Sequence, residues 1–293
     1  SRAPKRPARK LTPADEARIV RARRQLPTWG ARRLKRDLQL PYSVKTIRRV
    51  IRQRGLARRW RRKKHETKRS LRAIKRLWRL WQQISIDTKN LCDLPEYWLQ
   101  AQAFDLPRYQ YTARDVTTGV LFLAYSNELS LTYAQLFAER IAEHLKVHQV
   151  RLSDVTVQTD NGSEFVGSWQ AVNPSAFTQT LNAYGISHRT IPPGAHRFQS
   201  DVETIHSLME IEFFLEPFTD RSDFIRKAET YQDFFNYVRP NSGKENKSPW
   251  DLVQTKIRNP PLSLLHLPPV FLEELLHAKL HPSPGGDHVG VLP

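Results

Sequence analysis

The sequence predicts a mixed α/β domain preceded by a small all-helical module. From Ile84 onward, short β-branched and aromatic runs alternate with stretches of helical periodicity, an order typical of a sheet flanked by helices. Residues 12–53 instead contain short helical patterns separated by turn residues. Residues 1–80 hold 30 of the 47 Lys and Arg residues but 4 of the 29 Asp and Glu residues, a net +26 against −8 for the remainder. The helical module is therefore the part expected to contact phosphates.

Three short helices are predicted after a Pro- and Arg-rich arm. Thr12 can cap the first, with Pro13 in its first turn, and the pattern ends near Pro27. The second is expected at Gly30–Leu38 and the third at Val44–Gln53. This spacing predicts a helix-turn-helix unit, whose third helix would enter a DNA major groove.

The outward face of the third helix and the basic run after it are the candidate DNA contacts. Most basic contacts of such units go to phosphates, so each Arg is a candidate phosphate contact before it is a base reader. The candidates are Lys45, Thr46, Arg48, Arg49, Arg52, Arg58, Arg59, Arg61, Arg62, Lys63 and Lys64. The run Arg58–Lys64 is nearly all cationic and is expected to be a flexible tether.

An amphipathic linker helix is expected at Thr67–Gln82. Its apolar residues recur at helical spacing and are Leu71, Ile74, Leu77, Trp78 and Trp81. They are expected to pack on the domain that follows, although the same stripe could pack on another subunit.

The α/β domain is predicted element by element from its periodicity. Strands are expected at Ile84–Lys89, Tyr109–Asp115, Val120–Tyr125, Val155–Thr159 and Ile186–Thr190. Helices are expected at Thr132–Val147, Phe177–Tyr184, Ser200–Phe214 and Arg221–Val238, with another opening at Ser248-Pro249-Trp250. Beyond Arg258 the Pro-rich chain is expected to be weakly structured. The predicted domains are residues 1–58 (arm and helix-turn-helix), 59–82 (linker), 83–254 (α/β domain) and 255–293 (tail).

Three carboxylates stand at the ends of predicted elements. Asp87 and Asp160 each end a strand, and Glu203 lies one turn into a helix. Converging carboxylates suit Mg²⁺, and a pair of such ions suits phosphoryl transfer. Two of these carboxylates also have an ordinary structural interpretation: Ser200-x-x-Glu203 fits a capping box, and Asp160-Asn161-Gly162 fits a plain turn.

Four stretches resemble bacterial insertion-sequence transposases of the retroviral-integrase type. These are I-S-I-D-T-K, Q-T-D-N-G-S-E-F, I-P-P-G-x-x-x-x-Q-S-D-V-E-T-I-H and K-S-P-W-D-L, and the resemblance runs from about Thr12 to about Val253. It implies a ribonuclease-H-like fold with an Asp, Asp, Glu triad that binds two Mg²⁺ or Mn²⁺ ions. By position, the triad falls on Asp87, Asp160 and Glu203. The 43-residue spacing from Asp160 to Glu203 is longer than usual, and a loop at residues 166–175 accounts for the excess.

The resemblance implies a DNA transposase that cuts the ends of a mobile element and joins them to target DNA. Its partners would be double-stranded DNA and further copies of the chain on paired ends. Arg197 and Gln199 are candidate contacts to the DNA end, and Asn161 and His206 are possible accessory residues. The nearest other carboxylates are Glu164 and Asp201. Asp201 lies about 200° around the helix from Glu203, so both cannot face one metal pair.

Two other functions remain open on the residues alone. A transposase-derived DNA-binding regulator would need no triad, yet all three carboxylates are present. A plain nuclease of the same fold would need no site-reading module. No apolar run is long enough to span a bilayer. The single cysteine, Cys92, excludes an internal disulfide and fits a reducing cytoplasm. The resemblance implies a bacterial cytoplasm, with the protein associated with the nucleoid.

Overall fold

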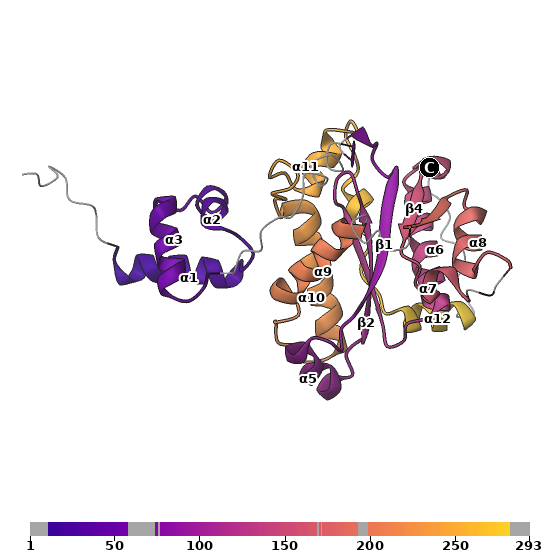
Figure 1. Cartoon of the computed structure of the whole chain (residues 1–293), viewed down its shortest axis with the longest axis horizontal. Coiled ribbons are helices and arrows are strands. Elements are labelled where there is room, and N and C mark those ends of the chain that lie inside the picture. Colours follow the sequence, from indigo (N-terminus) through magenta and orange to yellow (C-terminus); the bar gives the residue numbers. More distant parts are fainter. Residues whose placement is uncertain are drawn as a thin grey trace, which may run out of the picture. The chain divides into compact units, whose positions relative to one another are not determined.

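The computed structural model describes residues 11–57, 74–75, 77–168, 170, 172–192 and 199–281. The chain divides into two compact units, residues 1–65 and 66–293, and each is described by itself (Figure 1). Within these described ranges, no helix has both the length and the apolar character needed to cross a membrane.

The first unit is the predicted bundle of three helices. They are α1 (Pro13–Gln25), α2 (Ala31–Asp37) and α3 (Val44–Gln53). Thr12 caps α1 through a reciprocal capping box, because Asp15 N donates to Thr12 Oγ1 and Thr12 N donates to Asp15 Oδ2. The buried core is Ile19, Ala22, Trp29, Ala31, Leu34, Leu40, Ile47, Val50 and Ile51.

Two polar contacts fix how the helices of this unit meet. Tyr42, which precedes α3, donates its hydroxyl to Asp15 Oδ1 of α1 at 2.7 Å. The guanidinium of Arg23 is buried and donates to the carbonyl oxygens of Trp29 (2.9 Å) and Leu56 (3.1 Å). Arg23 therefore joins α1 to the loop before α2 and to the segment after α3, and its buried side chain is not part of the exposed basic surface.

The second unit contains an open five-stranded mixed sheet in the order β3-β2-β1-β4-β5. The strands are β1 (Gln83–Asn90), β2 (Tyr109–Asp115), β3 (Leu121–Ser126), β4 (Thr156–Thr159) and β5 (Ser187–Thr190). Each lies within one residue of its predicted bounds. β1 pairs antiparallel with β2, and β2 with β3, whereas β1 pairs parallel with β4, and β4 with β5.

Helices cover both faces of this sheet, which confirms the predicted α/β class. The helices of the second unit are α5 (Pro95–Phe104), α6 (Leu131–Val147), α7 (Ser163–Val166), α8 (Ala176–Ala183), α9 (Ser200–Glu212), α10 (Arg221–Asp233), α11 (Pro249–Gln254) and α12 (Leu272–Leu280), with short turns η1 (Leu152–Asp154), η3 (Phe234–Val238) and η4 (Leu262–Leu265). On β3, Phe122 joins the core with α6 and α8, and Leu123 joins the core with α9 and α10. Figure 1 shows these helix pairs on opposite sides of β1.

Amide side chains cover the free edge of β3. Gln232 accepts from Leu123 N at 2.8 Å, and Asn236 accepts from Leu121 N at 2.8 Å and donates to Leu121 O at 2.9 Å. Both amides are fully buried, and Asn236 lies in η3, a π-helical turn that continues α10. Capping the edge in this way removes unpaired backbone groups that could recruit another strand.

The prediction of a weakly structured chain beyond Arg258 is wrong for residues 259–281. This segment forms η4 and α12, and the side chains of Leu265 and Leu272 are completely buried. Tyr125 N of β3 donates to Val270 O at 2.9 Å. Tertiary contacts with the sheet, which local sequence does not reveal, order this Pro-rich segment. The helices α5 and α7 were also not predicted.

The predicted linker helix does not extend to Gln82. Residues 67–73 lie outside the described part of the chain. Ile74, Lys75 and Leu77 are helical, but the chain turns at Trp78 and Trp81 has a φ of 62°. Trp81 is buried and stacks on Phe122, whereas the side chain of Leu77 is 84% exposed. The described part of the apolar stripe therefore does not pack on the domain as one face.

We predict that Leu265→Ala destabilises the second unit by about 2–5 kcal/mol, because it removes a fully buried side chain and leaves a cavity. Leu262→Ala is the matched control in the same turn; its side chain is 64% exposed, so the change should stay within about 0.5 kcal/mol. Urea unfolding of both variants measures the difference. Equal stability would mean that η4 is not part of the core.

Candidate active site

The register of β1 and β4 brings two of the predicted carboxylates level. The paired residues end at Ser85 opposite Gln158, and continuing the register by two places Asp87 opposite Asp160. Gln83 Nε2 donates to Gln158 Oε1 at 2.8 Å, so these two side chains lie on the same face of the sheet. Asp87 and Asp160 follow at alternate positions and therefore lie on that face too. Asp87 and Asp160 thus stand on adjacent parallel strands where the pairing stops.

Helix α9 lies across the same face and carries the third carboxylate. His206 of α9 contacts Thr112 Oγ1 at 3.1 Å, and Thr112 is the β2 partner of Asp87. Glu203 lies one turn earlier on α9, exposed to solvent. Ser200 lies inside the helix and α9 has no side-chain cap, so the capping-box interpretation of Glu203 is not supported.

The far end of α9 is fixed by a buried ion pair. Arg239 donates to Glu212 through Nε (3.0 Å) and Nη2 (2.8 Å), and these side chains are 4% and 3% exposed. Tyr231 donates its hydroxyl to the same carboxylate at 3.1 Å. Together with the packing of Ile205, this holds the helix that carries Glu203 in place.

Asp87 is strongly influenced by the other carboxylates. Burial and the negative charges of Asp160, Glu164 and Glu203 raise the pKa of Asp87 to about 7, against the opposing effect of a hydrogen bond from Thr88 N. The largest effects on this pKa come from burial and from neighbouring carboxylates, and no positively charged side chain is among them. The four carboxylates therefore gather negative charge at one site, which suits a divalent cation.

The turn after β4 orients Asp160. Gly162 N donates to Asp160 Oδ1 at 2.8 Å, and Asn161 Nδ2 donates to Ile191 O at 2.9 Å. The turn interpretation and the carboxylate interpretation of this motif are therefore compatible. Asn161, predicted as an accessory residue, attaches the turn to the end of β5.

Histidine 206 lies beside Asp87. Its Nδ1 is 3.9 Å from Asp87 Oδ2, and the residue is 8% exposed. Burial, and then the charge of Lys89, lowers the pKa of His206 to about 3, so the ring is neutral near neutral pH. Lys89 itself pairs with Glu210 at 2.8 Å. The neutral ring therefore lies beside Asp87 without neutralising its charge, and its hydrogen bond goes to Thr112.

Gln199 does not have the surface position expected of a DNA contact. It is 4% exposed, and its amide nitrogen lies 3.5 Å from Ile86 O. With the amide turned, the nitrogen donates to Asp87 Oδ2 at 3.3 Å and the oxygen accepts from Asp160 N at 2.5 Å. The side chain therefore bridges the two aspartates. Arg197 lies outside the described residues.

The two other carboxylates near the triad have different surroundings. Asp201 forms an ion pair with Lys75, and its carbonyl oxygen accepts from Arg114 at 2.6 Å, so it belongs to a separate basic cluster. Glu164 of α7 is 8% exposed and accepts from Thr88 Oγ1 at 2.8 Å. Sequence reasoning treated Glu164 as a neighbouring carboxylate only; its place in the Q-T-D-N-G-S-E-F motif was the available signal.

Another acidic cluster has the spacing of a single-metal site. In the described part of the chain, Glu229, Asp233 and His266 bring ligand atoms within 4.8 Å of one another, and the triad is not grouped at that spacing. His266 Nδ1 lies 3.2 Å from Asp233 and Nε2 lies 3.7 Å from Glu229. Each ring nitrogen thus already faces a carboxylate. A two-ion site shares its carboxylates between ions about 4 Å apart, so it does not require the single-metal spacing.

The predicted DNA-contacting face of α3 is exposed. Lys45, Arg48, Arg49 and Arg52 all point away from the buried side of the helix, and Thr46 is partly exposed. These residues and Gln53 line a shallow groove. The remaining predicted contacts, Arg58, Arg59, Arg61, Arg62, Lys63 and Lys64, lie outside the described residues.

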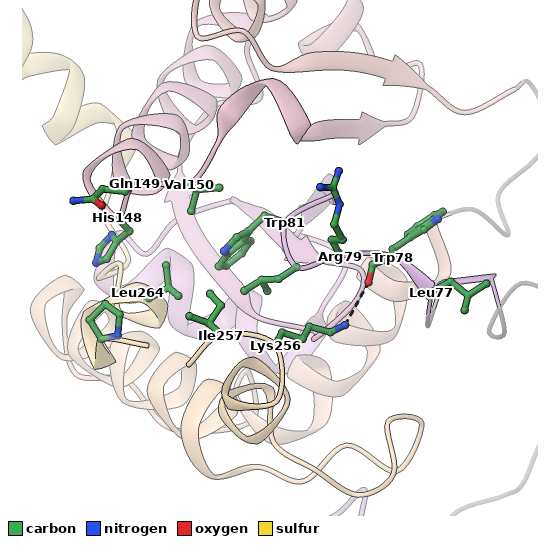
Figure 2. Close-up of a pocket in the computed structure, with 12 residues that line it drawn as sticks. Leu77, Trp78, Arg79, Trp81, His148, Gln149, Val150, Lys256, Ile257 and Leu264 are labelled. Atoms are coloured by element: carbon green, nitrogen blue, oxygen red, sulfur yellow. Dashed lines mark hydrogen bonds between the residues drawn. The ribbon is translucent and has the colours of Figure 1, made fainter. Parts of the chain in front are cut away.

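A second groove, of ≈ 640 Å³, opens at the start of the second unit (Figure 2). It is lined by Leu77, Trp78, Arg79, Leu80, Trp81, His148, Gln149, Val150, Lys256, Ile257, Pro261 and Leu264. Lys256 Nζ donates to Trp78 O at 3.4 Å, the contact drawn in Figure 2. No residue of the triad lines this groove, so it is separate from the acidic site.

No protein-family model and no curated protein matches this sequence. The arrangement of the site therefore has to be interpreted from its own chemistry.

We predict that Asp87→Asn stabilises the metal-free protein at pH 8 by about 1–4 kcal/mol. The pKa of Asp87 is higher in the folded than in the unfolded state. The stabilisation that this group contributes is therefore fully present below its unfolded-state pKa and is lost as pH rises through about 7. The benefit of the amide should therefore disappear near pH 4. Urea unfolding across this pH range measures it, with the exposed Asp93→Asn as control. An equal benefit at pH 4 and pH 8 would contradict the assigned cause.

Proposed function

We propose that the protein is a DNA transposase, which cleaves DNA at the ends of a mobile element and transfers those ends to target DNA. The observation that carries this proposal is the grouping of Asp87 and Asp160, level on adjacent parallel strands, with Glu203 on the helix that crosses them. The four sequence stretches that resemble insertion-sequence transposases contain these same three residues.

We infer that the second unit is ribonuclease-H-like. Its sheet begins with three antiparallel strands and adds β4 and β5 in parallel, on the other side of β1. The carboxylates lie where the central strand meets its parallel neighbour, and α9 packs on β1 and β2. This order supports the fold that the resemblance implies.

The residues of the site fit two Mg²⁺ or Mn²⁺ ions. The donors are carboxylate oxygens, which both metals prefer, and the carboxylates of Asp160, Glu164 and Glu203 raise the pKa of Asp87, as expected where negative charges gather. Asp87 lies where it could contact both ions, with Asp160 on one and Glu203 on the other. Bound ions would stabilise charge on the attacking and leaving oxygens of an in-line displacement.

The two steps use the same phosphoryl chemistry. In cleavage, a water oxygen bonds to phosphorus and the bond to the 3′ oxygen breaks, leaving a 3′-OH. In transfer, that 3′-OH gives up its proton and bonds to a target phosphorus, releasing another 3′ oxygen. Neither step needs a protein nucleophile. Gln199 bridges the two aspartates, His206 lies beside Asp87, and Gly162 N leaves Asp160 Oδ2 free of the turn hydrogen bond.

The helical unit supplies the proposed recognition of DNA. Residues 1–80 carry +26, and the exposed face of α3 carries four of these positive charges. A site-reading module attached to a phosphoryl-transfer domain favours a transposase over a plain nuclease. Joining two ends to one target requires two 3′-OH groups delivered together, so we infer that the active form is an oligomer on paired ends.

A test of the active site is the set Asp87→Asn, Asp160→Asn and Glu203→Gln. Each should abolish Mg²⁺-dependent cleavage and strand transfer and leave DNA binding intact, because each removes a carboxylate from the metal site. Asp201→Asn is the control on the same helix; its partner is Lys75, and it should keep much more activity. Assays with the DNA that flanks the coding sequence provide the readout. Robust cleavage by any triad variant would refute the assignment.

A test of the recognition helix is Arg48→Ala. We expect a phosphate contact, so affinity should fall alike for all sequences and the slope of log K against log salt should decrease by about 1. Loss of about 1–3 kcal/mol of discrimination at one base pair would instead identify a base reader. Arg54→Ala is the control, since Arg54 follows α3 and pairs with Glu16 at 2.6 Å.

A further inference from the structure

Glu164 is a buried carboxylate with one hydroxyl group as its partner. Its residue is 8% exposed, and it accepts from Thr88 Oγ1 at 2.8 Å. Among the residues that the structure describes, no Lys, Arg or His forms an ion pair with it. Burying a charge with so few partners costs stability. This cost suggests that the carboxylate of Glu164 has a function in addition to packing α7 against the domain.

The partner of Glu164 lies directly beside the proposed metal ligands. Thr88 uses both of its donors: its backbone N–H donates to Asp87 Oδ1 at 3.0 Å and its hydroxyl donates to Glu164. One residue of β1 thus connects the carboxylate of Asp87 to a carboxylate on the segment that follows Asp160.

Glu164 also lies against the turn that holds Asp160. A Cβ added to Gly162 would come within 2.7 Å of Glu164 Cδ, although the backbone of Gly162, with a φ of −60°, would accept any residue. A side chain at this position would therefore displace the carboxylate of Glu164 from its place beside the turn. Because Gly162 N donates to Asp160 Oδ1, Glu164 touches the residue that orients Asp160.

These contacts lie where the sheet no longer sets the distance between the strands. The paired residues of β1 and β4 end at Ser85 and Gln158, two positions before Asp87 and Asp160. Beyond that point, backbone hydrogen bonds do not hold the two aspartates at a fixed separation. The hydrogen bond from Thr88 to Glu164 crosses this gap.

We propose that Glu164 is a positioning residue: by accepting the hydroxyl of Thr88 and packing on Gly162, it fixes the separation of Asp87 and Asp160 and is not itself a metal ligand. The proposal rests on the proposed function for its consequence, since the separation sets how the aspartates share two ions. The hydrogen bond from Thr88 to Glu164, together with the contact of Glu164 with Gly162, is called the brace; it forms without any bound metal. Residues that support metal ligands change metal affinity by about 10- to 100-fold when they are removed.

Variants of the full chain separate the brace from the charge of Glu164. Thr88→Val keeps every charge but removes the hydroxyl, and Thr88→Ser restores it. Glu164→Gln keeps an acceptor oxygen but removes the charge, and Glu164→Leu removes both. Gly162→Ala displaces the carboxylate and leaves the hydroxyl in place. Calorimetric titration with Mn²⁺, without DNA, gives the affinity of each variant.

A positioning role predicts a definite order of affinities. Thr88→Val, Gly162→Ala and Glu164→Leu should each weaken Mn²⁺ binding about tenfold or more, and Thr88→Ser should restore it. Glu164→Gln should remain closer to the original protein than Thr88→Val. The double variant Thr88→Val/Glu164→Leu should be no weaker than the worse single variant, because both changes break one interaction.

Two results would overturn the proposal. If Glu164→Gln lost as much affinity as Glu164→Leu and Thr88→Val lost none, Glu164 would act through its charge or as a ligand. If all these variants bound Mn²⁺ normally, the brace would have no role in the site. Asp87→Asn distinguishes this failure from failure of the proposed function: Mn²⁺ binding that survives Asp87→Asn would refute the metal site itself.

Discussion

The parallel pairing of β1 with β4 is the constraint on which the candidate site depends. Its register sets Asp87 level with Asp160, and a shift by one residue would send one aspartate to the opposite face of the sheet. The hydrogen bond between Gln83 and Gln158 lies on the same face; Gln158 is two residues before Asp160, and Gln83 is four residues before Asp87. Asp87 and Asp160 therefore continue a polar row that begins with these two glutamines.

The packing of α9 on one face of the sheet fixes the position of the third carboxylate, Glu203, relative to Asp87 and Asp160. Helix α9 packs through Ile205 and Met209 into the core that includes Leu123, and the pair of Glu212 with Arg239 fixes its other end. Because the helix is fixed at both points, Glu203 cannot move away without disturbing the core. The amides of Gln232 and Asn236 and the hydrogen bond from Tyr125 N to Val270 O close the free edge of the sheet at β3.

The two units carry net charges of opposite sign. The first unit presents four exposed cationic side chains on α3, where phosphate can approach. The second unit has net negative charge and gathers carboxylates around Asp87, which raise the pKa of that residue to about 7. Such a site repels a DNA strand until cations bind. DNA affinity and metal affinity would then be properties of different units.

Local sequence determined most of the secondary structure and the three carboxylates. Caps and periodicity located α1 to α3, and alternation located all five strands, because these signals act over a few neighbouring residues. The family-like motifs singled out Asp87, Asp160 and Glu203, and the structure brings them to one end of β1 and β4.

Only the tertiary structure decided the surroundings of those residues. The brace from Thr88 to Glu164 joins residues 76 positions apart, and Gln199 reaches the aspartates from a different element. The ordering of residues 259–281 depends on the edge of β3, and the end of the linker helix before Trp78 places Trp81 against Phe122. Each of these features comes from contacts between distant segments, and no pattern of neighbouring residues encodes such contacts.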